Sequence, residues 1–277
     1  MRLSIQYPVF DQIQQAREHG VPLYFDLRKE AMGDKAAALS VIEWFYSKGI
    51  TDFTVLEAPN GRTPFMLNEY NLPYRFELKD ADEPIDGLDI HTAGNNDSLW
   101  VLNPYLATVG IHPKLPLAVT QTDEIVFCAL TDVEYNERRE MDIQCIRNTV
   151  DYLRSEGLNV VLISDSADPR LSDKLSLSFN ECIMRLAGAK CVIAGDTGFA
   201  HVAAALGKPV VSIMWDMYLH GVARLDDCVR TSEWFGIPTQ YTAKSFLPNT
   251  NHGAVVLMAT DHTWSLEHVL RSVKKIV

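Results

Sequence analysis

The stretch AGAKCVIAGDTGFAHVAAALGKPVVSIMW, residues 187–215, decides the fold of this chain. Its apolar run from Cys191 to Ala194 predicts a buried strand, and the next four residues, 195–198, predict a tight turn into a helix. That helix is rich in alanine and ends at Gly207, with Pro209 shortly after it, as helix ends commonly do. A second apolar run follows, so the stretch has the pattern of a strand, a helix and a strand in a parallel sheet.

The same alternation continues on both sides of this stretch, which predicts an α/β protein. In the first half, apolar runs at residues 23–27 and 53–56 flank a helical pattern at 36–48. In the second half the alternation restarts at residue 124. Further strands are expected at 74–78, 99–102, 125–130 and 159–163, further helices at 138–155 and 176–186, and a last helix at 266–275.

Two such series imply two domains, which also fits the length of 277 residues. Residues 111–121 contain Pro113 and Pro116, and because proline interrupts both strands and helices, we expect the linker there. We place the boundary near residue 120, with an N-terminal domain of residues 1–120 and a C-terminal domain of residues 121–277. Ligands of parallel sheets bind beyond the carboxyl ends of the strands, so the loops after the strands are where a site is expected.

The composition argues against several other classes of protein. A hydrophobic content of 47% and a charged content of 22% are ordinary for a globular chain. The formal net charge of −11 argues against nucleic-acid binding without excluding it. The 5 cysteines are an odd set without Cys-x-x-Cys spacing, which predicts neither a disulfide framework nor a zinc site. Neither a signal peptide nor a membrane span is recognisable, so we expect a cytoplasmic protein.

The turn at residues 195–198 has the chemistry of an anion site. Gly198 allows close approach of a ligand, and the free N–H groups at the helix start, together with the Thr197 hydroxyl, suit a phosphate. His201, one turn into the helix, is within reach of the same anion. The alternative is structural: Asp196 or Thr197 caps the helix and His201 is an ordinary core histidine. Residue chemistry alone leaves both interpretations open.

The turn and helix resemble the nucleotide-sugar motif of glycosyltransferase family 9, the heptosyltransferases, in the pattern Asp196-Thr197-Gly198-x-x-His201-x-Ala203-x-Ala205-x-Gly207-x-Pro209. The resemblance implies a GT-B fold, in which two Rossmann-like domains face each other across a cleft and the C-terminal helix can cross back. It also implies that Thr197 and Gly198 bind the diphosphate of a nucleotide-sugar donor in the C-terminal domain, while the N-terminal domain serves the acceptor.

The first strand, loop and helix agree with the same resemblance. Family 9 places Gly-Asp where a helix opens after the first strand, and this chain has Gly33 and Asp34 there. The resemblance makes Asp34 the general base that removes the proton of the acceptor hydroxyl, with Gly33 in the acceptor loop. The alternative from the residues alone is that Asp34 is the N-cap of its helix.

Two further donor contacts are expected at the ends of strands in the second half. The family places a cation after the first strand of this domain, and Arg138 or Arg139 is the candidate for holding the diphosphate. After the strand at 159–163, Asp165 stands where the family contacts the ribose or the base, and a carboxylate accepts hydrogen bonds from ribose hydroxyls.

The function predicted from the sequence is transfer of a sugar from a nucleotide-diphosphate sugar to the hydroxyl of an unidentified acceptor. The transfer is expected to invert the anomeric centre and to require neither a metal nor another cofactor. No two of the 8 histidines stand at i,i+4, so a helical zinc motif is absent. Residues 1–120 hold 10 Lys and Arg against 16 Asp and Glu, which disfavours an anionic acceptor. The alternatives are a nucleotide-sugar epimerase of GT-B fold and a catalytically silent nucleotide- or sugar-binding protein. A nicotinamide dehydrogenase is disfavoured because no Gly-x-Gly-x-x-Gly follows a strand.

Overall fold

The computed structural model of the chain describes residues 8–60, 64–91, 102–129, 140–215, 233–234, 247–250 and 253–277. Their contacts divide the chain into two compact units. Described residues up to Pro113, together with residues 233–234, belong to the first unit, and those of residues 114–215 and 247–277 belong to the second. The assignment of residues 1–120 to an acceptor and of residues 121–277 to a donor remains a prediction.

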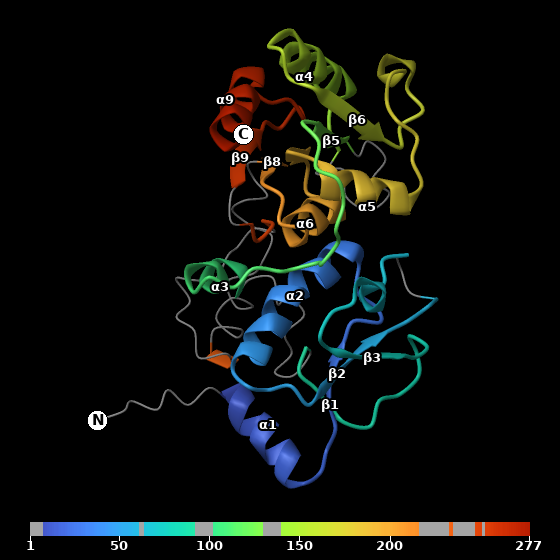
Figure 1. The fold of residues 1–277 in the computed structure, drawn as a ribbon, viewed down its shortest axis with the longest axis vertical. Coiled ribbons are helices and arrows are strands. Elements are labelled where there is room, and N and C mark those ends of the chain that lie inside the picture. The colour runs from blue at the N-terminus through green and yellow to red at the C-terminus, as the bar shows by residue number, and fades with distance from the viewer. Residues whose placement is uncertain are drawn as a thin grey trace, which may run out of the picture. The chain divides into compact units, whose positions relative to one another are not determined.

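The first unit is built on a parallel sheet of four strands in the order β3-β2-β1-β4 (Figure 1). Each strand pair runs in the same direction, so the carboxyl ends of β1 and β2 lie at one edge of the sheet. The elements, in chain order, are α1 (Pro8–Glu18), β1 (Leu23–Asp26), α2 (Met32–Ser47), β2 (Phe53–Glu57), the 3-10 helix η1 (Leu67–Tyr70), β3 (Arg75–Leu78), β4 (Leu88–Asp89) and α3 (Asn103–Thr108).

Aromatic side chains form much of the core between α2 and this sheet. The ring centroids of Phe25 in β1 and Phe45 in α2 lie 5.5 Å apart, and those of Phe25 and Phe53 lie 5.0 Å apart. Phe10 of α1 contacts Trp44 and Phe45 from outside, with centroids 5.6 Å away in both cases. Edge-to-face contacts of this kind bury large apolar surfaces, so α2 is held firmly against the sheet.

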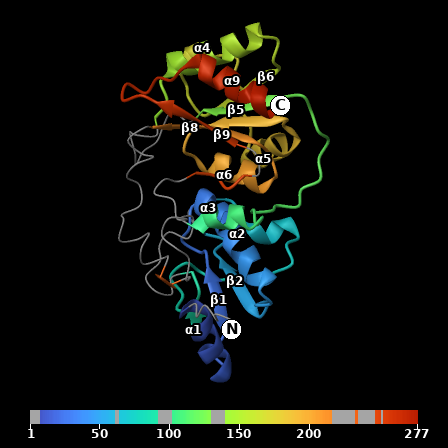
Figure 2. The ribbon, with the colours of Figure 1, turned by 90° about the vertical axis from the view of Figure 1, so that its left-hand side faces the viewer.

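The second unit contains a parallel sheet of five strands in the order β6-β5-β7-β8-β9. Helices cover both faces of it: α4 and α9 lie on one face, and α5 and α6 on the other (Figure 2). The elements, in chain order, are β5 (Ile125–Ala129), α4 (Ile143–Ser155), β6 (Val160–Ser164), the 3-10 helix η4 (Pro169–Leu171), α5 (Phe179–Gly188), β7 (Cys191–Ala194), α6 (Gly198–Ala205), β8 (Val210–Trp215), β9 (Gly253–Met258) and α9 (Leu266–Ile276).

The C-terminal helix α9 is anchored within the second unit. Val269, Leu270 and Val273 are buried in the core that α4 also covers. Just before the helix, the Nε1–H of Trp264 donates to the Thr149 hydroxyl of α4 at 2.9 Å. The buried side of α9 therefore belongs to the second unit. None of the helices among the described residues is both long enough and apolar enough to cross a membrane.

Most of the predicted elements are confirmed. The strands expected at 23–27, 53–56, 74–78, 125–130, 159–163 and 191–194 are present in their described parts, with ends shifted by one or two residues at most. Of the strand expected at 99–102, only Leu102 is described, and it is the residue before α3. Helix α1 and the edge strand β9 are present in addition to the predicted elements.

Three helices begin away from the predicted residues, and for two of them a side-chain cap explains the difference. Helix α4 begins at Ile143 rather than residue 138, because the Asp142 carboxylate caps it by accepting from the Cys145 N–H at 2.6 Å. Helix α5 begins at Phe179 rather than residue 176, because Ser178 and Glu181 form a capping box. Helix α2 begins four residues early, at Met32.

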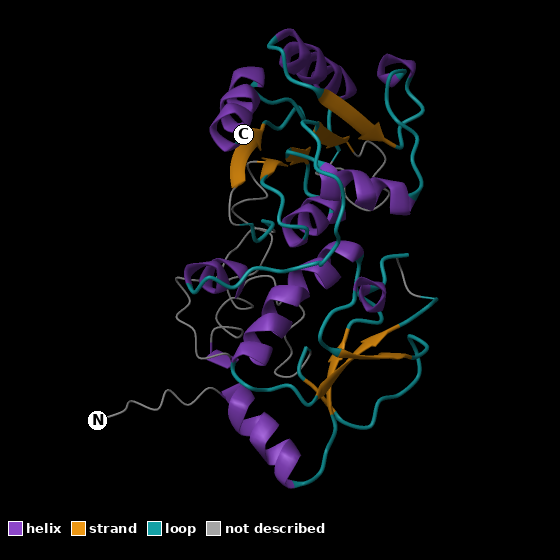
Figure 3. Cartoon of the chain, in the orientation of Figure 1, coloured by secondary structure: helices purple, strands orange, loops and turns teal. Residues whose placement is uncertain are grey.

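The segment predicted as a linker, residues 111–121, forms neither helix nor strand (Figure 3). Its later half is fastened to the second unit. The Leu115 N–H donates to the Ala205 carbonyl at 2.7 Å, and the side chain of Gln121 accepts a hydrogen bond from Lys208. The second unit therefore begins at Lys114, within the predicted linker.

Candidate functional site

Three strands of the second unit end at the same edge of its sheet. Ala129 of β5 is in register with Ser164 of β6, and Cys128 is in register with Ala194 of β7. The loops that follow these strands therefore start side by side, as ligand-binding loops of parallel sheets do. The candidate donor residues Asp165, Asp196 and Thr197 lie in two of these loops.

The turn between β7 and α6 places Thr197 at the N-cap of the helix. Its hydroxyl makes no capping bond, and the Ala200 N–H is instead bonded to the Thr197 carbonyl at 3.1 Å. Thr197 is 5% exposed, and within the described residues its Oγ1 has no hydrogen-bond partner. A buried hydroxyl without a partner costs free energy unless a ligand supplies one. Hydroxyl and helix N-terminus together form a site suited to an anion.

The neighbours of Thr197 are also buried. Asp196 is 7% exposed and His201, in the first turns of α6, is 2% exposed. At Gly195 a Cβ would lie 3.3 Å from the Met141 sulfur, which is a closer contact than most Cβ atoms make. The alternative in which Asp196 or Thr197 caps α6 agrees with the structure only in position. Thr197 is the N-cap residue, but no side chain makes the capping hydrogen bond.

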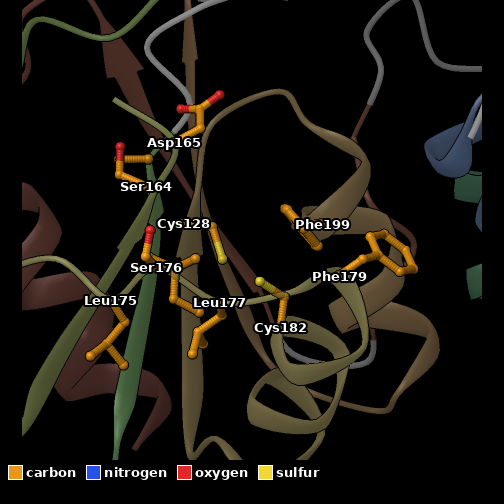
Figure 4. Close-up of a pocket in the computed structure, with 11 residues that line it drawn as sticks. Cys128, Ser164, Asp165, Leu175, Ser176, Leu177, Phe179, Cys182 and Phe199 are labelled. Atoms are coloured by element: carbon orange, nitrogen blue, oxygen red, sulfur yellow. The ribbon is translucent and has the colours of Figure 1, made fainter. Parts of the chain in front are cut away.

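A pocket of about 310 Å³ opens beside this turn (Figure 4). Phe199, the residue after Gly198, forms part of its wall, so the pocket and the N-terminus of α6 are contiguous. Asp165 and Ser164 stand at the end of β6 on the opposite part of the lining. The remaining wall consists largely of apolar groups and thiols, contributed by Cys128, Ala129, Ile163, Leu175, Ser176, Leu177, Phe179 and Cys182.

The aromatic and thiol groups give the pocket an uncharged wall. The rings of Phe179 and Phe199 are stacked, with centroids 6.1 Å apart and an angle of 29° between their planes. Burial raises the pKa of the Cys128 thiol and also that of the Cys182 thiol, so both remain protonated at neutral pH. An apolar chamber with the exposed carboxylate of Asp165 at one end suits a flat ring joined to a polyhydroxyl group.

In the first unit, Asp34 is the third residue of α2, at the carboxyl edge of the sheet. The alternative in which Asp34 is the N-cap is wrong, because the N-cap is Ala31. Asp34 is half-buried and Gly33 is buried. A carboxylate in the first turn of a helix interacts favourably with the helix dipole, and Asp34 stands there without being the N-cap.

The same edge of the first unit carries a bidentate ion pair. Arg28 donates to Asp26 Oδ1 at 2.8 Å and to Oδ2 at 2.7 Å, and its third nitrogen donates to the carbonyls of Asp80 and Glu83. Burial by itself raises the pKa of Asp26, but the hydrogen bonds from Arg28 outweigh it, so the pKa of Asp26 is lowered. This arrangement fixes the loop between β1 and α2, which leads into the first turn of α2 where Asp34 stands.

Not every candidate residue can be placed. Arg138 and Arg139 lie outside the described residues. Among the residues that are described, no cluster of three or more His, Cys, Asp or Glu side chains is arranged to hold a metal ion. Sequence reasoning missed Phe179, Phe199, Cys128 and Cys182 as lining residues. Phe199 and Cys128 stand beside a helix N-terminus and a strand end, which is the signal that would have found them.

The sequence matches the model of glycosyltransferase family 9 (heptosyltransferase) over residues 151–215. This range holds Asp165, Asp196, Thr197, Gly198 and His201. The resemblance inferred from the pattern at residues 196–209 is thereby confirmed. A comparison with curated proteins gave no match.

Solved structures establish the fold. The family 9 glycosyl transferase of Veillonella parvula is 11% identical, with a TM-score of 0.53, over 92% of this chain and 97% of that one. The ADP-heptose lps heptosyltransferase II of E. coli is 12% identical, with a TM-score of 0.53, over 92% of this chain and 98% of that one. The chain therefore has the two-unit α/β fold of GT-B glycosyltransferases. It is heptosyltransferase-like in fold and, over residues 151–215, in sequence.

A third likeness is weaker. TibC of enterotoxigenic E. coli, described as an iron-containing dodecameric glycosyltransferase, is 17% identical with a TM-score of 0.48. The match covers 70% of this chain and only 58% of TibC. A likeness of that size establishes no shared activity, metal or assembly.

Proposed function

We propose that this protein is a glycosyltransferase that moves a sugar from a nucleotide-diphosphate sugar to an acceptor hydroxyl. The observation that carries the proposal is the buried, unbonded hydroxyl of Thr197 at the N-terminus of α6, contiguous with a pocket of about 310 Å³. The family model covers this same segment. Diphosphate and nucleoside are the two parts of a donor that such a pair of sites would take.

The diphosphate would lie against Thr197 and Gly198. Its charge meets the N–H groups of the first turn of α6, where the helix dipole favours an anion, and it accepts a hydrogen bond from the Thr197 hydroxyl. Both interactions strengthen as the diphosphate leaves, because negative charge grows on its oxygens during bond cleavage. Arg138 or Arg139 remains the proposed cation, and Asp196 and His201 are proposed to line the same site.

The nucleoside would occupy the pocket between Phe199 and Asp165. The apolar wall suits the base, and the exposed Asp165 carboxylate suits hydrogen bonds from the ribose hydroxyls. The name of the E. coli neighbour contains ADP-heptose, so ADP and its sugar conjugates come first among the donors to test.

Asp34 is proposed to act as the general base, with Gly33 leaving room for the acceptor. As the acceptor oxygen attacks the anomeric carbon, the new glycosidic bond forms and the bond to the diphosphate breaks. The acceptor proton passes to the Asp34 carboxylate, and the nucleoside diphosphate leaves from the opposite face, which inverts the anomeric centre. We propose that the reaction needs no metal and takes place in the cytoplasm, where the buried free thiols of the described cysteines stay reduced.

Analysis of the products tests this proposal against its alternatives. The purified protein is incubated with ADP-, UDP-, GDP- and CDP-sugars, with and without candidate sugar acceptors, in EDTA and with added divalent cations. A transferase releases the nucleoside diphosphate and makes a new glycoside. Conversion of the donor into another nucleotide sugar would identify an epimerase, and binding without any conversion would identify a silent binding protein. Loss of activity in EDTA, restored by a cation, would overturn the metal-independent mechanism.

A further inference from the structure

The first unit buries an ion pair for which the proposed reaction has no direct use. Lys35, the residue after Asp34, and Glu57, the last residue of β2, are both 0% exposed. The Lys35 Nζ lies 3.4 Å from Glu57 Oε1. Both residues stand at the carboxyl edge of the sheet, where Asp34 in the first turn of α2 also lies.

Backbone groups of a single segment, residues 65–68, hydrogen-bond to both members of the pair. The Lys35 ammonium also donates to the Phe65 carbonyl at 3.0 Å. The Glu57 carboxylate accepts from the Leu67 N–H through Oε1 and from the Asn68 N–H through Oε2, each at 2.9 Å. The two side chains therefore connect three parts of the fold: the first turn of α2, the end of β2 and the start of η1.

The stability of the folded protein does not explain why the charged side chains of Lys35 and Glu57 are buried here. Moving two charges out of water carries a large desolvation cost, and apolar pairs of similar volume are often equally stable or more so. Buried ionic groups with several directed hydrogen bonds can instead fix one arrangement of the segments that they join, as they do in some proteins. The segment that the pair fixes on the α2 side is the first turn of this helix, which contains Asp34.

We propose that the buried Lys35–Glu57 pair is a positioning device, which locks the first turn of α2 to the loop before η1 and so holds the Asp34 carboxylate in its working orientation. Neither side chain touches substrate in this inference; both act through Asp34 and through residues 65–68. The inference rests on the proposed role of Asp34 as the base. A misplacement of about 1 Å in a reacting group can cost about 100-fold in rate, so a device of this kind affects turnover strongly.

Three variants test it: Lys35→Met, Glu57→Gln and the double variant Lys35→Met/Glu57→Gln, which buries no charge. We expect the double variant to remain folded, with kcat for sugar transfer lowered by about 100-fold. Its Kd for the nucleoside diphosphate should equal that of the wild type, because the donor site lies in the other unit. A double variant that is folded and retains wild-type kcat overturns the inference.

Tyr74→Phe is the matched control. It removes the 2.8 Å hydrogen bond from Tyr74 to Glu43, which also joins α2 to a later segment of the first unit but lies far along the helix from Asp34. It should lower the melting temperature and leave kcat unchanged. If the control lowers kcat as much as the double variant does, the effect is general loosening and the inference fails.

Hydrogen–deuterium exchange gives a readout that needs no activity. In folded Glu57→Gln, the amides of residues 65–68 and those of residues 32–35 should exchange faster together. Faster exchange of residues 65–68 alone would show that the pair does not reach α2. If the wild type transfers no sugar from any donor, the proposed function fails, while this exchange result still decides whether the two segments are coupled.

Discussion

Thr197 is the single residue on which the proposed donor site depends most. Serine, threonine and aspartate at an N-cap normally accept a hydrogen bond from the helix backbone, as Ser265 does for the His268 N–H of α9. Thr197 has the position without the bond, and its buried hydroxyl has no partner among the described residues. The hydroxyl is therefore available to a ligand rather than committed to the fold.

Replacing Thr197 by valine separates these two roles. Because no capping bond is lost, Thr197→Val should leave the free energy of unfolding unchanged or slightly raised. It should weaken nucleoside-diphosphate binding by roughly tenfold, the value of about one hydrogen bond to a charged group. Calorimetric titration and urea unfolding measure the two effects. Ser265→Ala is the control with the opposite pattern: about 1 kcal/mol less stability and unchanged affinity. Lower stability together with unchanged affinity in Thr197→Val would contradict the assignment.

Asp34 carries the second prediction at this scale. Asp34→Asn keeps the size of the side chain but cannot accept the acceptor proton, so kcat should fall by about 100-fold or more while donor Kd stays the same. Steady-state kinetics with a donor that the wild type uses, together with titration of the diphosphate, measure both quantities. Turnover at the wild-type rate would remove Asp34 from the mechanism.

At the scale of elements, regular apolar patterns predicted most strands, and side-chain caps decided what the patterns could not. The buried run Cys191–Ala194 is found as predicted, because a short apolar strand between turns has few alternatives. The start of α4 depends on one hydrogen bond from Cys145 to Asp142, which no periodicity reveals. Strand β9 was not predicted, because the exposed side of the strand carries Val255 and Leu257. It therefore lacks the alternation of polar and apolar residues that marks an edge strand.

The candidate site also has a part that could be located from the sequence and a part that could not. The turn that we propose to bind phosphate could be located from the sequence, because its residues are contiguous between a strand and a helix. The pocket wall could not, since Cys128, Asp165, Phe179 and Phe199 come from different elements and meet only when the strands are in register. The Lys35–Glu57 pair was equally hidden, because a lysine in a helix is normally at the surface.

The loop between β1 and α2 leads to a prediction about pH. The pKa of Asp26 in the folded protein is lowered from its ordinary value of 3.8. Its contribution to stability is therefore fully present above that value and is lost as the pH falls through the lower folded pKa. Unfolding by urea between pH 2 and pH 6 should show that wild type and Asp26→Asn differ in stability near pH 6 and converge toward pH 2. A constant difference across this range would mean that the Asp26–Arg28 pair is not the cause.

At the scale of the whole molecule, the observations that bear on function are distributed unequally between the two units. The family model and every proposed donor residue that is described fall in the second unit, whereas the first unit contributes Gly33, Asp34 and the buried pair behind them. The donor can therefore be tested without any acceptor. The acceptor has to be sought by experiment, starting from the acidic character of residues 1–120.

The most direct test of the central claim is a thermal-shift measurement of the wild type and Gly198→Trp with ADP, UDP, GDP and CDP. A ligand at about 100 times its Kd stabilises the folded state by about 2.7 kcal/mol, which raises the melting temperature by several degrees. The account predicts a selective rise with one diphosphate in the wild type and none in Gly198→Trp, whose indole would fill the space at the N-terminus of α6. No rise with any diphosphate, or a rise that persists in the variant, would contradict a donor site at this turn.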